Sequence, residues 1–126
     1  MGINTYKKSE RLCSKKLIKE LFNKGSSFYL YPYKIIFLKA PLEVNSDQVL
    51  FSVPKRNFKK AVDRNKVRRR SKEAYRLNKQ LLQGGNYLLI AYIYTAKEIL
   101  DYSVIEEKLK SILLRLHKDN EKVDEK

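Results

Sequence analysis

The segment that most constrains the fold is a nearly continuous apolar run at residues 87–95, Tyr-Leu-Leu-Ile-Ala-Tyr-Ile-Tyr-Thr. Its length and its richness in tyrosine and isoleucine fit one β-strand. Because apolar side chains do not alternate with polar ones, neither face of such a strand can be left to water. The run therefore predicts a strand that is covered on both faces.

Three helices are predicted to supply that cover. The first spans residues 14–24, with Ser14 as its cap and Gly25 as its stop. The second is long, spans residues 61–82, and ends at Gly84 and Gly85. The third begins at Ser103, because Ser103 and Glu106 have the spacing of a capping box.

Two further stretches have the pattern of strands. Residues 28–38 predict one or two strands with a break at Pro32, and residues 48–54 predict another. The order α-β-β-β-α-β-α indicates an α+β fold, a two-layer α/β sandwich with three helices on a small mixed sheet of about four strands. We expect residues 1–117 to form a single domain and the charged residues 118–126 to be a frayed tail.

The net charge of +14 is concentrated in two segments. Residues 54–79 contain twelve basic and two acidic side chains, and residues 1–25 contain seven and two. The stretches 26–53 and 80–117 are each neutral overall. A surplus confined in this way predicts a binding surface for a polyanion.

Helical periodicity separates two faces of the predicted helix 61–82. Its core stripe consists of Val67, Ser71, Ala74, Tyr75, Asn78, Leu81 and Leu82. The candidate RNA-binding residues beside that stripe are Arg64, Asn65, Arg68, Arg69, Lys72 and Arg76. Arginine can bind phosphate with two nitrogens, and an asparagine can accept as well as donate hydrogen bonds. A merely solvated helix face would normally contain more acidic residues among the basic ones.

The chain shows no sign of a membrane or secretory setting. The single Cys13 cannot form an intramolecular disulfide, and no apolar run approaches the roughly 20 residues that a membrane span needs. We therefore expect a cytoplasmic protein with no membrane partner and no small-molecule substrate.

Residues 61–73, Ala-Val-Asp-Arg-Asn-Lys-Val-Arg-Arg-Arg-Ser-Lys-Glu, resemble the signature helix of the bacterial ribonuclease P protein, A-V-x-R-N-x-h-K-R-x-x-R-E with h apolar. The matching residues are Arg64, Asn65, Val67, Arg69 and Glu73, whereas Arg68 replaces the usual lysine and Lys72 the usual arginine. The order of the other segments is similar to that of the family. One departure is the connector 55–60, which lacks a glycine common there and is one residue longer.

The resemblance implies the protein subunit of ribonuclease P, an accessory to a catalytic RNA that removes the 5′ leader of precursor tRNA. Its implied partners are that RNA and the single-stranded leader, and the Mg²⁺ is used by the RNA-based holoenzyme. The signature helix would dock on the RNA together with the basic connector residues Lys55, Arg56, Lys59 and Lys60. The resemblance also implies a left-handed β-α-β crossover, against a strong general rule.

The family's leader cleft lies between the first helix and the sheet. Its candidate residues here are Ile18, Phe22, Tyr33, Ile35 and Phe37, because aromatic platforms bind single strands with little sequence preference. Strand alternation places the last three on one face. The same spacing also suits core residues, so both interpretations stay open.

The residues favour a protein that is not itself the catalyst. The only histidine, His117, lies late in the last predicted helix, and the acidic residues are scattered. The chain has no metal-spaced cysteine and histidine set, so we expect no metal or cofactor in the protein. Two alternatives remain, a ribosomal or other structural RNA-binding protein and a free-standing nuclease.

Overall fold

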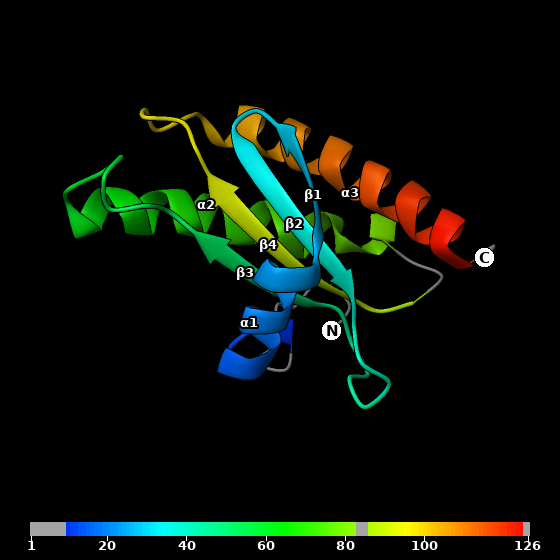
Figure 1. The fold of residues 1–126 in the computed structure, drawn as a ribbon. Helices are drawn as coiled ribbons and strands as arrows, with labels where there is room; N and C mark the ends of the chain where they lie inside the picture. The colour runs from blue at the N-terminus through cyan, green and yellow to red at the C-terminus, as the bar shows by residue number, and fades with distance from the viewer. Residues whose placement is uncertain (1–9, 83–85, 125–126) are drawn as a thin grey trace.

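The computed structural model describes residues 10–82 and 86–124, with side chains described up to residue 118. Its strands are β1 (Ser26–Leu30), β2 (Tyr33–Lys39), β3 (Gln48–Ser52) and β4 (Leu88–Tyr94). Its helices are α1 (Lys15–Lys24), α2 (Ala61–Asn78), the short 3₁₀ helix η2 (Lys79–Leu82) and α3 (Tyr102–Asp124). The α+β order predicted from the sequence is confirmed (Figure 1).

The apolar strand β4 lies inside the sheet, whose order is β1-β2-β4-β3. β2 pairs with both β1 and β4 in antiparallel fashion, whereas β3 pairs with β4 in parallel, so the sheet is mixed. The predicted break at Pro32 is the turn between β1 and β2.

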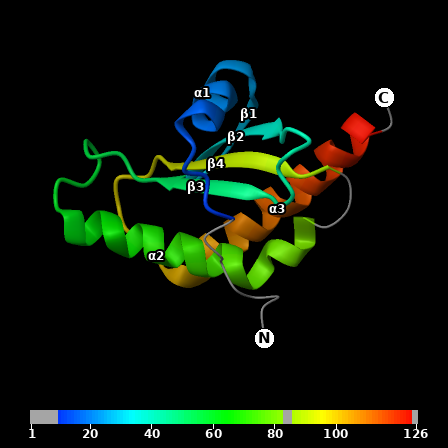
Figure 2. The ribbon, with the colours of Figure 1, turned by 90° about the horizontal axis from the view of Figure 1, so that it is seen from below.

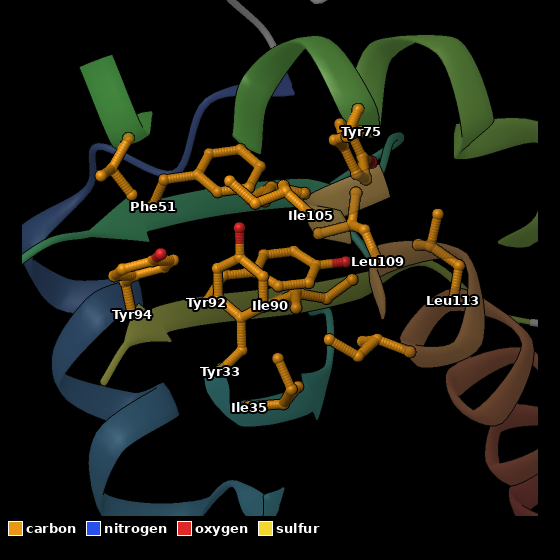
Figure 3. Close-up of a cluster of buried hydrophobic side chains, with 14 of the residues drawn as sticks. Tyr33, Ile35, Phe51, Tyr75, Ile90, Tyr92, Tyr94, Ile105, Leu109 and Leu113 are labelled. Atoms are coloured by element: carbon orange, nitrogen blue, oxygen red, sulfur yellow. The ribbon is translucent and has the colours of Figure 1, made fainter. Parts of the chain in front are cut away.

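Two hydrophobic clusters cover the two faces of β4. The larger cluster takes Ile90, Tyr92 and Tyr94 from this strand and lies against α2 and α3 (Figure 3). The smaller takes Leu89 and Ala91 and lies against α1, with Leu21 at its centre. Figure 2 shows the resulting arrangement, in which α1 lies on one face of the sheet and the two longer helices lie on the other. The prediction that β4 is covered on both faces is correct.

The crossover from β3 through α2 to β4 is left-handed. When β3 and β4 point upward and α2 lies behind the sheet, β4 lies to the right of β3 (Figures 1 and 2). Parallel strands are almost always joined with the opposite hand. The chain therefore adopts the unusual topology that the family resemblance implied.

Helix α1 begins after Ser14 and ends before Gly25, as predicted. The Ser14 hydroxyl accepts a hydrogen bond from the backbone N–H of Leu17, at 3.3 Å. Gly25 has φ −70°, which any residue adopts. A Cβ there would lie 2.5 Å from the carbonyl oxygen of Leu21 and 2.9 Å from the side chain of Ile36. Glycine is needed because α1 packs too closely on β2 for a side chain.

The start of α3 differs from the prediction, whereas the expected fraying of residues 118–126 stays a prediction. The helix begins at Tyr102, and the backbone N–H groups of Val104 and Ile105 donate to the carbonyl oxygen of Asp101. Ser103 lies inside the first turn, so the predicted capping box is wrong. The backbone also continues past residue 117 to Asp124, because no glycine or proline interrupts it. The predicted stops Gly84 and Gly85 lie outside the described residues.

Candidate nucleic-acid interface

The helix α2 is fixed on the sheet by the stripe that its periodicity predicts. Its buried residues are Val67, Ser71, Ala74, Tyr75 and Asn78. The hydroxyl of Ser71 is hydrogen-bonded to the hydroxyl of Tyr33 on β2. The amide of Asn78 donates to Glu106 on α3, at 3.0 Å. Buried polar contacts of this kind fix the rotation of the helix about its axis and its position along that axis.

The opposite side of α2 is hollowed by a pocket of about 420 Å³. Its lining residues are Asn65, Arg68, Arg69, Lys72, Glu73 and Arg76. Five of the six residues predicted to bind RNA on this helix therefore line one concave surface. Four cations around one acid create a positive potential that favours a phosphate group.

Two contacts inside the pocket fix its side chains. Arg68 donates to the side-chain oxygen of Asn65 at 2.9 Å. Arg76 donates to both carboxylate oxygens of Glu73, at 2.9 and 2.6 Å. These two bonds hold the pKa of Glu73 below its ordinary value. Glu73 thus pairs with Arg76, whose charge is thereby partly neutralised.

Arg64 is the predicted residue that does not line the pocket. Its Nη1 atom donates to two successive carbonyl oxygens, those of Phe58 at 2.8 Å and Lys59 at 2.9 Å. Both belong to the connector 55–60, which joins β3 to α2. The guanidinium therefore binds this chain's own backbone.

The connector presents its cations to solvent beside the first turn of α2. Lys55, Arg56, Lys59 and Lys60 are all exposed. Phe58 between them is 7% exposed and packs against Tyr94, with ring centroids 6.1 Å apart. One buried ring thus anchors a loop whose other side chains point outward. The connector leads directly into the first turn of α2 (Figure 2), so the four basic connector residues predicted from the sequence adjoin the basic helix.

The five predicted cleft residues do not come together, and the prediction that they line one cleft is wrong. Tyr33 and Ile35 are 1% and 0% exposed in the larger cluster, on the face of the sheet that α2 and α3 cover. Phe37 is half-buried on that same face, edge-on to Phe28 at 5.9 Å between ring centroids. Alternation correctly groups these three residues, but α1 packs on the other face.

Ile18 and Phe22 of α1 lie on that other face. Ile18 packs on the smaller cluster, whereas Phe22 is 47% exposed. The neighbouring cross-strand row on this face consists of Tyr29, Lys34, Ile93 and Ser52. Tyr29 is 57% exposed and Lys34 is exposed, so α1 leaves this end of the face uncovered. The row combines an aromatic ring, an amine and a hydroxyl.

Sequence reasoning missed a second, smaller pocket, of about 200 Å³, at the far end of α2. Its lining residues are Glu10, Asn45, Ser46, Asp47, Tyr75, Lys79 and Tyr87. Lys79 donates to both oxygens of Glu10, at 2.7 and 3.0 Å. Burial raises the pKa of Asp47 to about 6, although its carboxylate accepts a hydrogen bond from the N–H of Leu88. The pocket joins segments that are distant in the chain, so no local pattern reveals it.

Two other kinds of site are absent from the described ranges. No group of three histidine, cysteine or acidic side chains within residues 10–82 and 86–118 could hold a metal ion. Within the part of the chain that the structure describes, no helix has the length and apolar character to span a bilayer.

Comparison with known proteins identifies the family. The family model described as Ribonuclease P matches residues 6–117. The chain belongs to the ribonuclease P protein family. The ribonuclease P protein component of Porphyromonas gingivalis strain W83 is 36% identical over 115 residues, with 86% of this chain and 84% of that protein covered. That of Chlorobium phaeobacteroides is 35% identical, with 75% and 74% covered.

Solved structures of ribonuclease P proteins share the fold. The protein from Thermotoga maritima superposes with a TM-score of 0.71 at 26% identity, covering 84% of this chain and 96% of its own. The protein from Staphylococcus aureus gives a TM-score of 0.67 at 20% identity, covering 82% and 92%. Membership in the family supports a role as a ribonuclease P subunit in tRNA processing.

Proposed function

We propose that this subunit binds the catalytic RNA of ribonuclease P through α2 and the connector 55–60, and binds the single-stranded 5′ leader of precursor tRNA on the α1 face of the sheet. In this proposal it acts in the cytoplasm and the RNA performs the hydrolysis. The protein supplies positive charge, which the RNA lacks, and helps to position the substrate.

The observation that carries the proposal is the pocket on α2. Because its cations lie on one rigid helix, binding of a phosphate backbone requires no loss of main-chain entropy in the protein. The half-buried pair of Arg76 and Glu73 leaves Arg68, Arg69 and Lys72 as the net positive charge of the pocket. Docking of a structured RNA needs such a preformed surface more than it needs base-specific contacts.

The leader would lie along the exposed row beside α1. Phe22 and Tyr29 offer rings on which bases can stack, and Lys34 offers a charge for the backbone. This surface is on the opposite side of the sheet from α2 (Figure 2). One subunit could thus hold the enzyme RNA and the substrate at the same time.

Catalysis would belong to the RNA and its Mg²⁺. Among the described side chains there is no acidic cluster of the kind that binds two metals. The protein would raise the local concentration of precursor and reduce repulsion between two RNA molecules.

A cleavage assay on precursor tRNA tests this function. We expect no leader removal by the protein alone, and faster removal at low magnesium when protein is added to ribonuclease P RNA. Cleavage without that RNA would refute the proposal and indicate a free-standing nuclease. Binding without stimulation would indicate a structural RNA-binding protein.

The interface is tested by a charge-matched pair of variants. Arg68→Gln, Arg69→Gln and Lys72→Gln together should abolish stimulation at physiological salt and lower the slope of log affinity against log salt by up to about 0.7–0.9 per lost phosphate contact. The control replaces the exposed Lys97, Lys110 and Lys118 by glutamine and loses the same charge elsewhere. Equal loss in both variants would show that only net charge matters.

A further inference from the structure

The contact between Arg64 and the connector suggests a role that differs from direct RNA binding. A single nitrogen, Nη1, donates to the carbonyl oxygens of Phe58 and Lys59, at 2.8 and 2.9 Å. Arg64 is half-buried and lies one turn into α2. A charged donor bonded to two successive carbonyls restrains the orientation of the peptide between them.

The connector requires such a restraint because its charges repel one another. Four exposed cations lie within residues 55–60, and the positive end of the α2 dipole adjoins them. Lys60, the residue before the helix, provides no side-chain cap. The described contacts that oppose this repulsion are the buried ring of Phe58 and three backbone hydrogen bonds. The N–H of Asn57 donates to the carbonyl of Pro54 at 3.1 Å, and the N–H groups of Asp63 and Arg64 donate to the carbonyl of Lys60 at 3.2 and 3.3 Å.

These contacts leave the peptide between Phe58 and Lys59 to the side chain of Arg64, which binds the carbonyl oxygens of both residues. Lys59 belongs to that peptide and Lys60 follows it directly, and the side chains of both are exposed. If the carbonyl of Lys59 were released, these two cations could turn away from the pocket on α2. The restraint therefore determines whether connector and helix form one surface or two.

We propose that Arg64 is a positioning residue, which holds the basic connector against α2 so that Lys59 and Lys60 bind the same RNA as the pocket on the helix. The identity of that RNA rests on the proposed function, whereas the restraint itself does not. A lysine at position 64 would keep the charge but lose the planar guanidinium, so it should not reproduce the restraint.

Hydrogen exchange of the free, full-length protein tests the restraint. In Arg64→Ala and Arg64→Lys, peptides covering residues 55–62 should exchange about tenfold faster, the effect of losing roughly one charge-assisted hydrogen bond. Arg69→Ala, which removes a nearby arginine without a bond to the connector in the structure, should leave that exchange unchanged. Unchanged exchange in both Arg64 variants would overturn the proposal.

A double-mutant cycle tests the consequence for RNA binding. Arg64→Lys should weaken binding of ribonuclease P RNA about fivefold in the wild-type background, within the range of couplings between neighbouring groups. In the background Lys59→Gln with Lys60→Gln, the same change should have almost no effect. An equal loss in both backgrounds would show that Arg64 itself contacts RNA, and would refute the positioning role.

Failure of the positioning role and failure of the proposed function would give different results. If the wild-type protein bound ribonuclease P RNA no better than an unrelated structured RNA of equal length, the proposed function would fail while the exchange result stood. Urea unfolding of each variant verifies that it folds. Should Arg64→Ala not fold, the lysine variant still decides both measurements.

Discussion

The hydroxyl groups of Tyr33 on β2 and Ser71 on α2 are hydrogen-bonded to each other inside the larger hydrophobic cluster. Both residues are almost fully buried, at 1% and 2% exposed. Burial holds the pKa of Tyr33 well above its ordinary value, so the pair stays neutral. This contact joins the candidate RNA-binding helix to the sheet.

Removal of one hydroxyl should destabilise the protein, because the other remains buried without its partner. Tyr33→Phe should lower the free energy of unfolding by about 1–3 kcal/mol, measured by urea unfolding. The double variant with Ser71→Ala should lose less than the sum of the single losses. Tyr29→Phe is the control, because its hydroxyl is bonded to Thr95 at an exposed site. An equal effect at both tyrosines would contradict this account.

Asp47 should make the stability depend on pH between about 4 and 6, the interval from its ordinary pKa of 3.8 to its raised pKa of about 6. The folded state holds this proton more tightly than the unfolded chain does. The free energy of unfolding should therefore fall as the pH rises through this interval.

Asp47→Asn tests this dependence, because asparagine keeps the acceptor for the N–H of Leu88. Above pH 6 the variant should be more stable than the wild type by about 1–2 kcal/mol. This value is lower than the full pKa difference implies, because solvent near the carboxylate reduces the cost of its charge. Near pH 4 the two should agree. Glu43→Gln, on the exposed part of the same loop, should not change the profile. Parallel curves for wild type and Asp47→Asn would refute the assignment.

Glu73→Gln should strengthen RNA binding. The substitution removes the negative charge that is bonded to Arg76 and makes that guanidinium available to phosphate. If Arg76 gains one phosphate contact, the slope of log affinity against log salt should steepen by about 0.7–0.9. Glu107→Gln makes the same change of charge at an exposed position of α3 and should leave the slope as it is.

Gly25→Ala should be destabilising although the backbone angle is ordinary. The new methyl group would overlap the carbonyl of Leu21 at the end of α1 and the side chain of Ile36 on β2, so the end of α1 would have to shift away from β2. We expect a loss of about 1–3 kcal/mol in urea unfolding, the usual cost of overpacking. Asn23→Ala, at an exposed position of the same helix, should change stability little. A neutral Gly25→Ala would mean that α1 is loosely packed.

Substitutions on the two faces of the sheet should have different effects on substrate binding. Phe22→Ala should weaken binding of precursor tRNA more than of mature tRNA, by the roughly 1–3 kcal/mol of one lost base stack. Phe37→Leu, on the other face, should lower stability and affect both tRNAs alike. Selective loss of precursor binding in Phe37→Leu would place the leader against the α2 and α3 side.

The sequence predicts the elements well because their signals are local. The apolar run of β4, the core stripe of α2 and the break at Pro32 each depend on neighbouring residues. Alternation also shows that Tyr33 and Ile35 share a face. It cannot show which face α1 covers, because both faces of β2 are apolar and the choice depends on packing between distant segments.

The roles of individual cations were harder to predict. Arg64 and Arg68 are one turn apart and look equivalent on a helical wheel, yet one binds backbone carbonyls and the other lines the pocket. Every residue type has a backbone carbonyl, so the sequence does not show which carbonyl will accept a hydrogen bond. Charge patterning therefore identifies the surface, whereas the contact partner of each arginine follows only from the path of the connector.

The packing of α2 against elements that follow it in the chain bears on the order in which the protein can fold during synthesis. α2 leaves the ribosome before β4 and α3, the elements that cover much of its buried side. An isolated helix of 18 residues with this many like charges has little stability of its own. We therefore expect the nascent chain to acquire the proposed RNA-docking surface only when its last helix has been made. This delay would keep unfinished chains from occupying the catalytic RNA.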